Sequence, residues 1–217
     1  MMTRRTMTLG ALAASTILTA SGAVAAEQTV RDLPSPGQQG GKPLMEALTL
    51  RHSTRAYAPT PLPVQLLSDL LWAANGVNRP GGERTAPYWR HIMVTDIYVA
   101  MADGVWLYQP ETHKLQAYLP DDLRAATGLQ DFVGVAPLDL IYVAHGERMT
   151  DVAPAERRLY ASVDAAFIGQ NVYLFCASAG LGSVFRGAVP YESLTKKLAL
   201  PAEQFVTFAQ TVGYSGA

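Results

Sequence analysis

A nearly continuous apolar run at 138–145, LDLIYVAH, constrains the fold of this chain more than any other stretch. Such a run is typical of a strand that is buried within a sheet. Other segments read as strands by their β-branched and aromatic residues, at 91–100, 104–110, 113–119 and 204–214. The longest helix is predicted over 154–180, ending at the helix-breaking Gly180. The expected class is therefore α+β, with a mostly antiparallel sheet packed against helices.

Shorter helices are predicted around these elements, at 44–50, 62–74, 121–128 and 190–199. The second of them places one face of leucines and an alanine toward a core, namely Leu66, Leu67, Leu70, Leu71 and Ala74. Residues 75–90, NGVNRPGGERTAPYWR, form a predicted loop because of their Asn-Gly, Pro-Gly and Gly-Gly pairs.

The first 26 residues are predicted to be a secretory signal rather than part of the fold. They begin with basic residues, continue with a mild apolar stretch and end in small residues, as in an Ala-x-Ala cleavage site. The paired Arg4 and Arg5 favour the twin-arginine route, which predicts a periplasmic protein. The alternative is an uncleaved anchor, although a membrane span needs about 20 strongly apolar residues. Residues 27–42 are rich in Pro, Gly and Gln and are expected to be a flexible tether, leaving 43–217 as one domain.

Composition excludes several classes of function. The net charge of −1 offers no basic field that would attract nucleic acid. The single cysteine, Cys176, excludes an internal disulfide and a cysteine-based zinc cluster. The four histidines are scattered along the chain, so no metal site is expected. An apolar fraction of 49% suits a protein that hides part of its surface in an oligomer interface.

The segment RHSTR at 51–55 concentrates hydrogen-bond donors between two predicted helices. Arginine offers a planar fork of donors that grips phosphate, and Ser53 and Thr54 add hydroxyl donors. Free backbone N–H groups also gather at helix ends. The segment therefore predicts an anion site. The alternative is a solvated turn in which Ser and Thr cap a helix.

Four stretches of this chain, in order, resemble the FMN-dependent nitroreductase family: RHSTRAYAPTPLPVQLLSDLLWAA, RTAPYWRHIMVTDIYVA, DAAFIGQNVYLFCASAGLGSVFRGAV and FAQTVGY. The resemblance covers residues from about 44 to 214 and implies the family's fold, an intimate homodimer with flavin between the subunits. The single-domain length and the insertion NGVNRPGGERTAP are most similar to the SagB-type branch, which includes azoline-oxidising dehydrogenases.

The resemblance assigns roles to the residues of the opening motif. Arg51, Ser53 and Arg55 match the segment that holds the phosphate and ribityl chain of FMN. His52 is expected to contribute backbone contacts and a ring contact.

Further along the chain, the resemblance implies contacts to the flavin ring. Gln130 matches an amide that hydrogen-bonds a ring carbonyl. Arg186 and Gly187 match the loop whose backbone N–H groups address flavin N5 and O4, where donors stabilise the charge that builds on reduction. A glycine there lets the backbone approach the ring closely.

Two departures from the family pattern bear on affinity. The family's Pro-Ser-x-x-Asn-x-Gln reads PYWRHIM at 87–93, and the chain closes on GYSGA without the Lys/Arg segment of longer members. Either Arg90 and the two-arginine motif compensate, or the affinity for FMN falls. Tyr88 and Trp89 have two interpretations, loop packing or an aromatic lid over the flavin. Tyr88 and His91 are the candidates for acid–base chemistry.

The long predicted helix also carries polar residues among apolar neighbours, Asp164, Gln170 and Asn171. Because buried polar groups need partners, we interpret them as core or interface hydrogen-bonding residues. The resemblance thus predicts an exported FMN-dependent oxidoreductase that transfers a hydride to or from a small molecule. An exported enzyme meets little NAD(P)H, so a membrane quinol or a redox protein is the expected electron donor. The alternative is a non-catalytic binding module on the same dimeric scaffold, with or without flavin.

Overall fold

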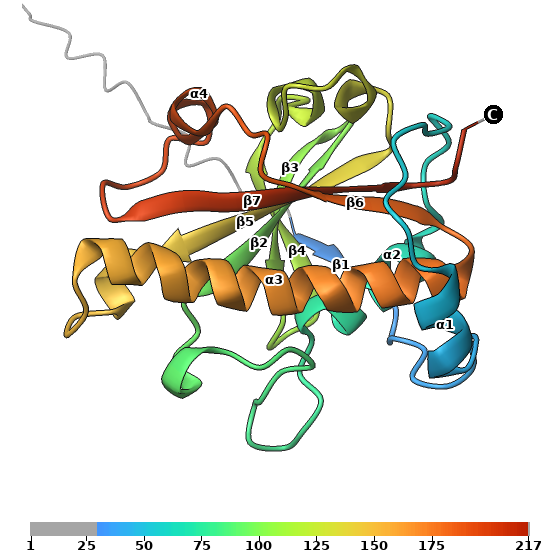
Figure 1. Cartoon of the computed structure of the whole chain (residues 1–217), viewed down its shortest axis with the longest axis horizontal. Coiled ribbons are helices and arrows are strands. Elements are labelled where there is room, and N and C mark those ends of the chain that lie inside the picture. The colour runs from blue at the N-terminus through green and yellow to red at the C-terminus, as the bar shows by residue number, and fades with distance from the viewer. Residues whose placement is uncertain (1–29, 217) are drawn as a thin grey trace, which may run out of the picture.

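The structure, a computed structural model, describes residues 30–216, and the signal predicted at 1–26 lies outside them. One antiparallel sheet of seven strands, in the order β1-β4-β3-β2-β5-β7-β6, forms the centre of the molecule (Figure 1). The strands are β1 (Val30–Asp32), β2 (Thr95–Met101), β3 (Gly104–Gln109), β4 (Lys114–Leu119), β5 (Leu138–His145), β6 (Gly182–Arg186) and β7 (Gln204–Gly213). Antiparallel pairing throughout and separate helices confirm the predicted α+β class.

Within residues 30–216, four α-helices accompany the sheet, α1 (Leu44–Leu50), α2 (Val64–Asn75), α3 (Pro154–Ala179) and α4 (Tyr191–Lys197). α3 runs nearly along the long axis of the molecule and crosses the sheet (Figure 1). Its N-terminus begins at a proline and its C-terminus ends at Gly180, whose left-handed backbone at φ 74° suits glycine. None of the helices within residues 30–216 combines the length and the apolar composition that a membrane span needs.

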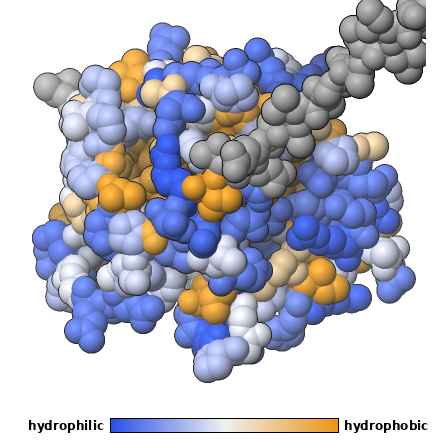
Figure 2. Space-filling model, turned by 180° about the vertical axis from the view of Figure 1, so that it is seen from behind, coloured by the Kyte–Doolittle hydropathy of each residue, from blue (hydrophilic) through white to orange (hydrophobic). Residues whose placement is uncertain are grey.

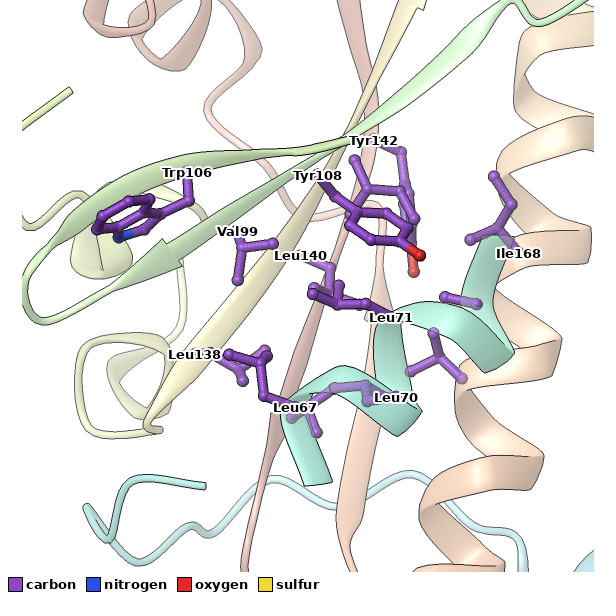
Figure 3. Packing of buried hydrophobic residues seen from close by; sticks show 14 of the residues in the cluster. Leu67, Leu70, Leu71, Val99, Trp106, Tyr108, Leu138, Leu140, Tyr142 and Ile168 are labelled. Carbon is purple, nitrogen blue, oxygen red and sulfur yellow. The ribbon is translucent and has the colours of Figure 1, made fainter. Parts of the chain in front are cut away.

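The sheet is covered on both faces at its central strand β5. All eight of its residues are buried, as its apolar run predicts. Leu138 and Leu140 belong to the main core under α2 and α3, whereas Ile141 packs with the second core beside α4. Figure 3 shows Leu67, Leu70 and Leu71 of α2 close to the strand residues of the main core. Each fully buried side chain of this kind contributes about 1.5–3 kcal/mol of hydrophobic stabilisation.

Most predicted elements are present within a few residues of their predicted bounds, but one predicted helix and the start of one predicted strand differ from the structure. The helix expected at 121–128 is a single 3-10 turn, Arg124–Ala126. Asp122 accepts hydrogen bonds from the Arg124 backbone N–H at 3.1 Å and from its Nε at 2.9 Å, and such local bonds compete with helix formation. The strand expected from residue 91 begins at Thr95, because Arg90 and His91 adopt positive φ angles in a 3-10 turn, Trp89–His91.

The flexible tether expected at 27–42 is also corrected, since the described part, residues 30–42, lies against the domain. β1 pairs with β4, with Val30 opposite Gln116. Arg31 forms a salt bridge with Asp103 at 2.5 Å, and Leu33 is buried in the main core. Ion pairing and apolar burial therefore hold a stretch whose Pro/Gly composition predicts a linker.

The face opposite to that of Figure 1 is mainly hydrophilic, with apolar residues interspersed in small groups (Figure 2). On the near side, by contrast, large apolar residues of α1 and α3 are exposed, among them Leu44, Met45, Leu159, Val163 and Phe167.

Candidate functional site

The predicted anion segment, residues 51–55, follows α1 and lies beside the start of β6. The backbone N–H of Thr54 donates to the carbonyl of Ser183 at 2.9 Å, and Ser53 forms a parallel bridge with Ser183. Gly182 permits this contact, because a Cβ there would lie 2.7 Å from the Thr54 side chain. β6, which the sequence did not reveal as a strand, thereby positions the segment.

Tyr173 on α3 connects the anion segment to β6. Its hydroxyl lies 2.9 Å from Ser53 Oγ and accepts a hydrogen bond from the Phe185 backbone N–H at 2.8 Å. The Arg51 guanidinium lies 5.2 Å from the centre of the Tyr173 ring, within reach of a cation–π interaction. Sequence reasoning missed Tyr173, because an aromatic residue in a long helix looks like an ordinary core residue.

The two arginines of the segment are available to a ligand. Neither Arg51 nor Arg55 forms a salt bridge with any carboxylate among the described residues. Arg55, Ser53 and His52 are exposed, and His52 Nδ1 lies 2.8 Å from the Leu50 carbonyl oxygen. Two guanidinium groups without intramolecular anions, next to a serine hydroxyl, form a donor set suited to phosphate.

Gln130 lies in a hollow beside this segment. The hollow, of about 660 Å³, is lined by Arg55, Tyr57, Gln130, Phe132 and neighbouring residues. The amide oxygen of Gln130 is buried and has no hydrogen-bond partner within residues 30–216. A buried acceptor of this kind is costly unless a donor from outside satisfies it. The structure therefore brings Gln130 and Arg55 to one place, as a shared ligand would require.

Gly187 lies next to the segment that carries Gln130, because the Leu129 backbone N–H donates to the Ala188 carbonyl at 3.2 Å. Gly187 is exposed, and a Cβ there would meet only the Phe208 ring, at the ordinary contact distance of 3.6 Å. Its φ is not positive, so neither backbone strain nor packing within the chain requires glycine. A ligand that approaches the backbone closely would be a reason for a glycine at this position.

The side chain of Arg186 does not face the hollow. It is buried and donates to Asp139 Oδ1 at 2.8 Å, to Thr211 Oγ1 at 3.0 Å and to the Thr127 carbonyl at 3.0 Å. Burial raises the pKa of Asp139 to about 7, an effect that the Arg186 charge opposes. Arg186 therefore anchors the end of β6, and any contact from this position to a ligand would come from its backbone.

Tyr88 and His91 lie elsewhere on the chain. Their rings are 5.8 Å apart in an edge-to-face contact on the 3-10 turn Trp89–His91. The Trp89 backbone N–H donates to Asp164 Oδ2 at 3.0 Å. Asp164 precedes Tyr173 by nine residues of α3, which is about 14 Å at the rise of an α-helix. A single chain therefore does not bring these candidates to the Arg51–Arg55 segment.

For Trp89, the neighbouring side chains distinguish the two interpretations, loop packing and an aromatic lid over the flavin. The Trp89 ring packs against Tyr160 of the same chain, at 5.8 Å, which agrees with loop packing.

The polar residues predicted on the long helix differ in burial. Burial raises the pKa of Asp164 to about 6, and the hydrogen bond from the Trp89 N–H opposes this effect. Asn171 donates to the Ala74 carbonyl at 3.4 Å, whereas Gln170 is exposed. Asp164 is thus a buried hydrogen-bonding residue, and Asn171 a half-buried one.

Comparisons with known proteins agree on one family. The sequence model described as Nitroreductase family matches residues 48–214. A protein of Methanocaldococcus jannaschii that is assigned by name as a nitroreductase is 36% identical over 155 residues, covering 67% of this chain and 78% of that protein.

Solved structures show the same fold. A protein of Ralstonia eutropha JMP134, also assigned by name as a nitroreductase, superposes with a TM-score of 0.83 at 44% identity, covering 87% of this chain and 90% of its own. The NADPH:FMN oxidoreductase of Vibrio harveyi superposes with a TM-score of 0.59 at 19% identity, covering 80% of this chain and 69% of its own. The second likeness extends to the fold alone.

Proposed function

This chain belongs to the nitroreductase family, and we propose that it works as an exported FMN-dependent oxidoreductase. Membership of the family makes it an oxidoreductase of the nitroreductase type. The further parts of the proposal are the cofactor, the homodimer, the SagB-type branch and the compartment. The long 75–90 loop supports the branch.

The observation that carries the proposal is the set of unsatisfied polar groups around the anion segment. Arg51 and Arg55 have no carboxylate partner among the described residues, and the buried Gln130 amide oxygen has no donor. FMN fits this set, because its phosphate suits two guanidinium groups and the Ser53 hydroxyl, and its ring N–H suits an amide oxygen. Each charged hydrogen bond to the phosphate would contribute about 1.5–3 kcal/mol.

FMN, when bound, supplies two-electron hydride chemistry. The residues of this chain bind and orient it. Gly187 leaves room for the ring, and the buried Arg186 side chain fixes the strand end from which the Gly187 backbone projects. Backbone donors held rigidly at such a position stabilise negative charge on a reduced ring because they need no reorganisation.

The proposed homodimer rests on the exposed apolar residues of α3. Leu159, Val163 and Phe167 are spaced four residues apart, so they share one face of the helix, and they are 59%, 42% and 45% exposed. Leu44, Met45 and Leu48 of α1, a helix that packs against α3, are exposed as well. Exposed apolar surface of this kind marks an interaction site.

A second copy of the chain would also complete the site. If two α3 helices pair in opposite directions, the Trp89–His91 turn of one copy, which lies near Asp164, would come toward the Tyr173 end of the other. Tyr88 and His91 would then reach a flavin held by the Arg51–Arg55 segment of the partner subunit. Such pairing would explain why Tyr88 and His91 lie far from the Arg51–Arg55 segment of their own chain.

Export and the electron donor follow from the N-terminal sequence. Arg4 and Arg5 begin a signal-like segment, and the twin-arginine route carries folded proteins, which suits a cofactor that is acquired in the cytoplasm. In the periplasm a membrane quinol or a redox protein would supply electrons in place of NAD(P)H. Replacing both arginines by lysine should leave a full-length flavoprotein in the cytoplasm, and cell fractionation tests this.

The cofactor is tested by purifying the full-length protein and measuring its visible absorption, followed by identification of any released flavin. We expect a yellow protein that releases FMN on denaturation. A colourless protein that also fails to bind added FMN would refute the proposed cofactor. A yellow protein that no quinol, redox protein or nicotinamide donor reduces would instead favour the non-catalytic module. Fast reduction by NADH or NADPH, at about 1–1,000 per second, would contradict the proposed donor.

A further inference from the structure

A second cavity, of about 320 Å³, lies at the ends of β2 and β3, under the 75–90 loop. Its polar lining includes Asn75, Arg84, Thr95 and Glu111, whereas Ile97 and Leu107 form part of its apolar wall. It has no lining residue in common with the hollow that contains Arg55 and Gln130. A ligand in this cavity would therefore bind independently of flavin.

Arg84 is held rigidly in this cavity by the loop that precedes β2. Val77 and Arg84 form an antiparallel bridge, and the Thr85 backbone N–H donates to the Gly76 carbonyl at 3.0 Å. The Asn78 backbone N–H donates to the Glu83 carbonyl at 3.0 Å, which closes the loop. The side chain of Arg84 is only 3% exposed as a result.

The hydrogen-bond donors of Arg84 are only partly satisfied. Its Nη2 pairs with the carboxylate of Glu111, which is itself 63% exposed on the turn between β3 and β4. Its Nε and Nη1 are buried and have no partner among the described residues. The Thr95 hydroxyl is likewise buried without a partner. The buried Asn75, 6% exposed, adds an amide to the same cavity.

Unpaired buried donors on one guanidinium are costly, and an acceptor that enters from outside would satisfy them. We propose that this cavity binds a small organic carboxylate, whose oxygens accept hydrogen bonds from Arg84 and Thr95. A carboxylate is the acceptor whose planar pair of oxygens matches a guanidinium. The apolar wall at Ile97 and Leu107 would contact the organic part of the ligand.

The charges around the cavity agree with an added anion. Asp96 also lines it, but its carboxylate already has partners, since it lies 2.7 Å from His145 Nε2 and 3.9 Å from Arg148 Nη1. Glu111 is then the acidic lining residue that competes with a ligand for Arg84. Since Glu111 is mostly exposed, it can turn toward solvent when a ligand carboxylate enters.

The test uses the full-length protein with benzoate as the probe and benzamide as its uncharged match, with binding measured by calorimetry. We expect saturable binding of benzoate, and weaker binding of benzamide. Arg84→Gln should weaken benzoate binding about tenfold to a hundredfold, as expected for the loss of charged hydrogen bonds. Thr95→Val, which preserves the side-chain shape and the fold, should weaken it severalfold.

Glu111→Gln gives the sharpest result, because it should strengthen benzoate binding by removing the competing carboxylate. Glu192→Gln and Lys196→Gln remove one charge each at exposed positions of α4, outside the cavity, and should leave binding unchanged. The proposal is overturned if wild-type protein shows no saturable binding. It is also overturned if benzamide binds as tightly as benzoate, or if Thr95→Val and Glu111→Gln both bind benzoate as the wild type does.

Discussion

Arg186 of β6 donates from Nη2 to Asp139 Oδ1 of β5 at 2.8 Å, with β7 lying between the two strands and both side chains at most 1% exposed. Thr211 of β7 completes the contact, since its hydroxyl donates to the same carboxylate oxygen at 2.5 Å. Three strands are thus joined by one buried ionic network. Because Arg186 directly precedes Gly187, this network connects the stability of the sheet to the candidate site.

Removing one member of this pair should destabilise the protein strongly. We expect Arg186→Met to lower the free energy of unfolding by about 3–5 kcal/mol, because Asp139 would remain buried without its counter-charge. The double variant Arg186→Met with Asp139→Leu should lose less than the sum of the two single variants. Urea denaturation measures the free energy of unfolding of the single variants and of the double variant. Lys196→Ala, in an exposed pair, should change stability by less than about 1 kcal/mol.

Arg51→Ala and Arg55→Ala should each weaken FMN binding while the fold persists. The loss of one charged hydrogen bond to phosphate costs about 1.5–3 kcal/mol, or roughly tenfold to a hundredfold in affinity. Fluorescence titration of flavin-free protein with FMN measures this. Lys197→Ala removes an exposed positive charge on α4 and should have no effect. Unchanged affinity in both arginine variants would remove the anion segment from the proposed site.

Gly187→Ala separates a ligand contact from a structural role. The added Cβ would meet only Phe208 at 3.6 Å, so the free energy of unfolding without flavin should change by less than about 1 kcal/mol. The affinity for FMN should nevertheless fall, because the methyl group would occupy space beside the ring. Equal affinity for FMN in the variant and the wild type would show that no ligand approaches this backbone closely.

Phe167→Glu should disrupt the proposed homodimer. A charge at Phe167, on the exposed apolar face of α3, would be buried without a partner in a dimer but exposed in a monomer. Light scattering should give the mass of a dimer for the wild type and a lower mass for the variant. Lys197→Ala changes a charge at an exposed position of α4, away from α3, and should leave the mass of the dimer unchanged. A wild-type protein that is monomeric with flavin bound would contradict the prediction.

His145 should make stability depend on pH. Burial lowers its pKa, but hydrogen bonds with Asp96 and Glu147, both at 2.7 Å, outweigh burial and raise the pKa above its ordinary value of about 6.5. A raised folded-state pKa means that the contribution to stability is fully present below about 6.5 and is lost as pH rises through the folded-state value. The stability difference between wild type and His145→Gln should therefore shrink from pH 5 to pH 9. Asp96→Asn should reduce this dependence; an unaltered dependence would exclude the histidine as its cause.

Local patterns predicted much of the architecture. The periodicity of leucines placed α2 within two residues of its bounds, and the apolar run at 138–145 identified β5 at the centre of the sheet. β1 and β6 escaped prediction because each is short and gains its stability from distant partners. β1 pairs with β4 about 85 residues later, and β6 pairs with β7 across α4. A short window of sequence does not show which distant strand a segment pairs with.

By itself, the sequence determined the four α-helices, the central strand and the donor-rich segment Arg51–Arg55, because periodicity and residue chemistry are local properties. Only the tertiary structure decided what the individual polar side chains do. It turned Arg186 into the interior, placed Tyr173 against Ser53, and buried Arg84 beside Glu111 with two donors unpaired. The physical reason is that the partners of these side chains lie on elements that meet only when the sheet and its helices bury their common core. Exposure and pairing, on which binding depends, are therefore properties of the folded chain.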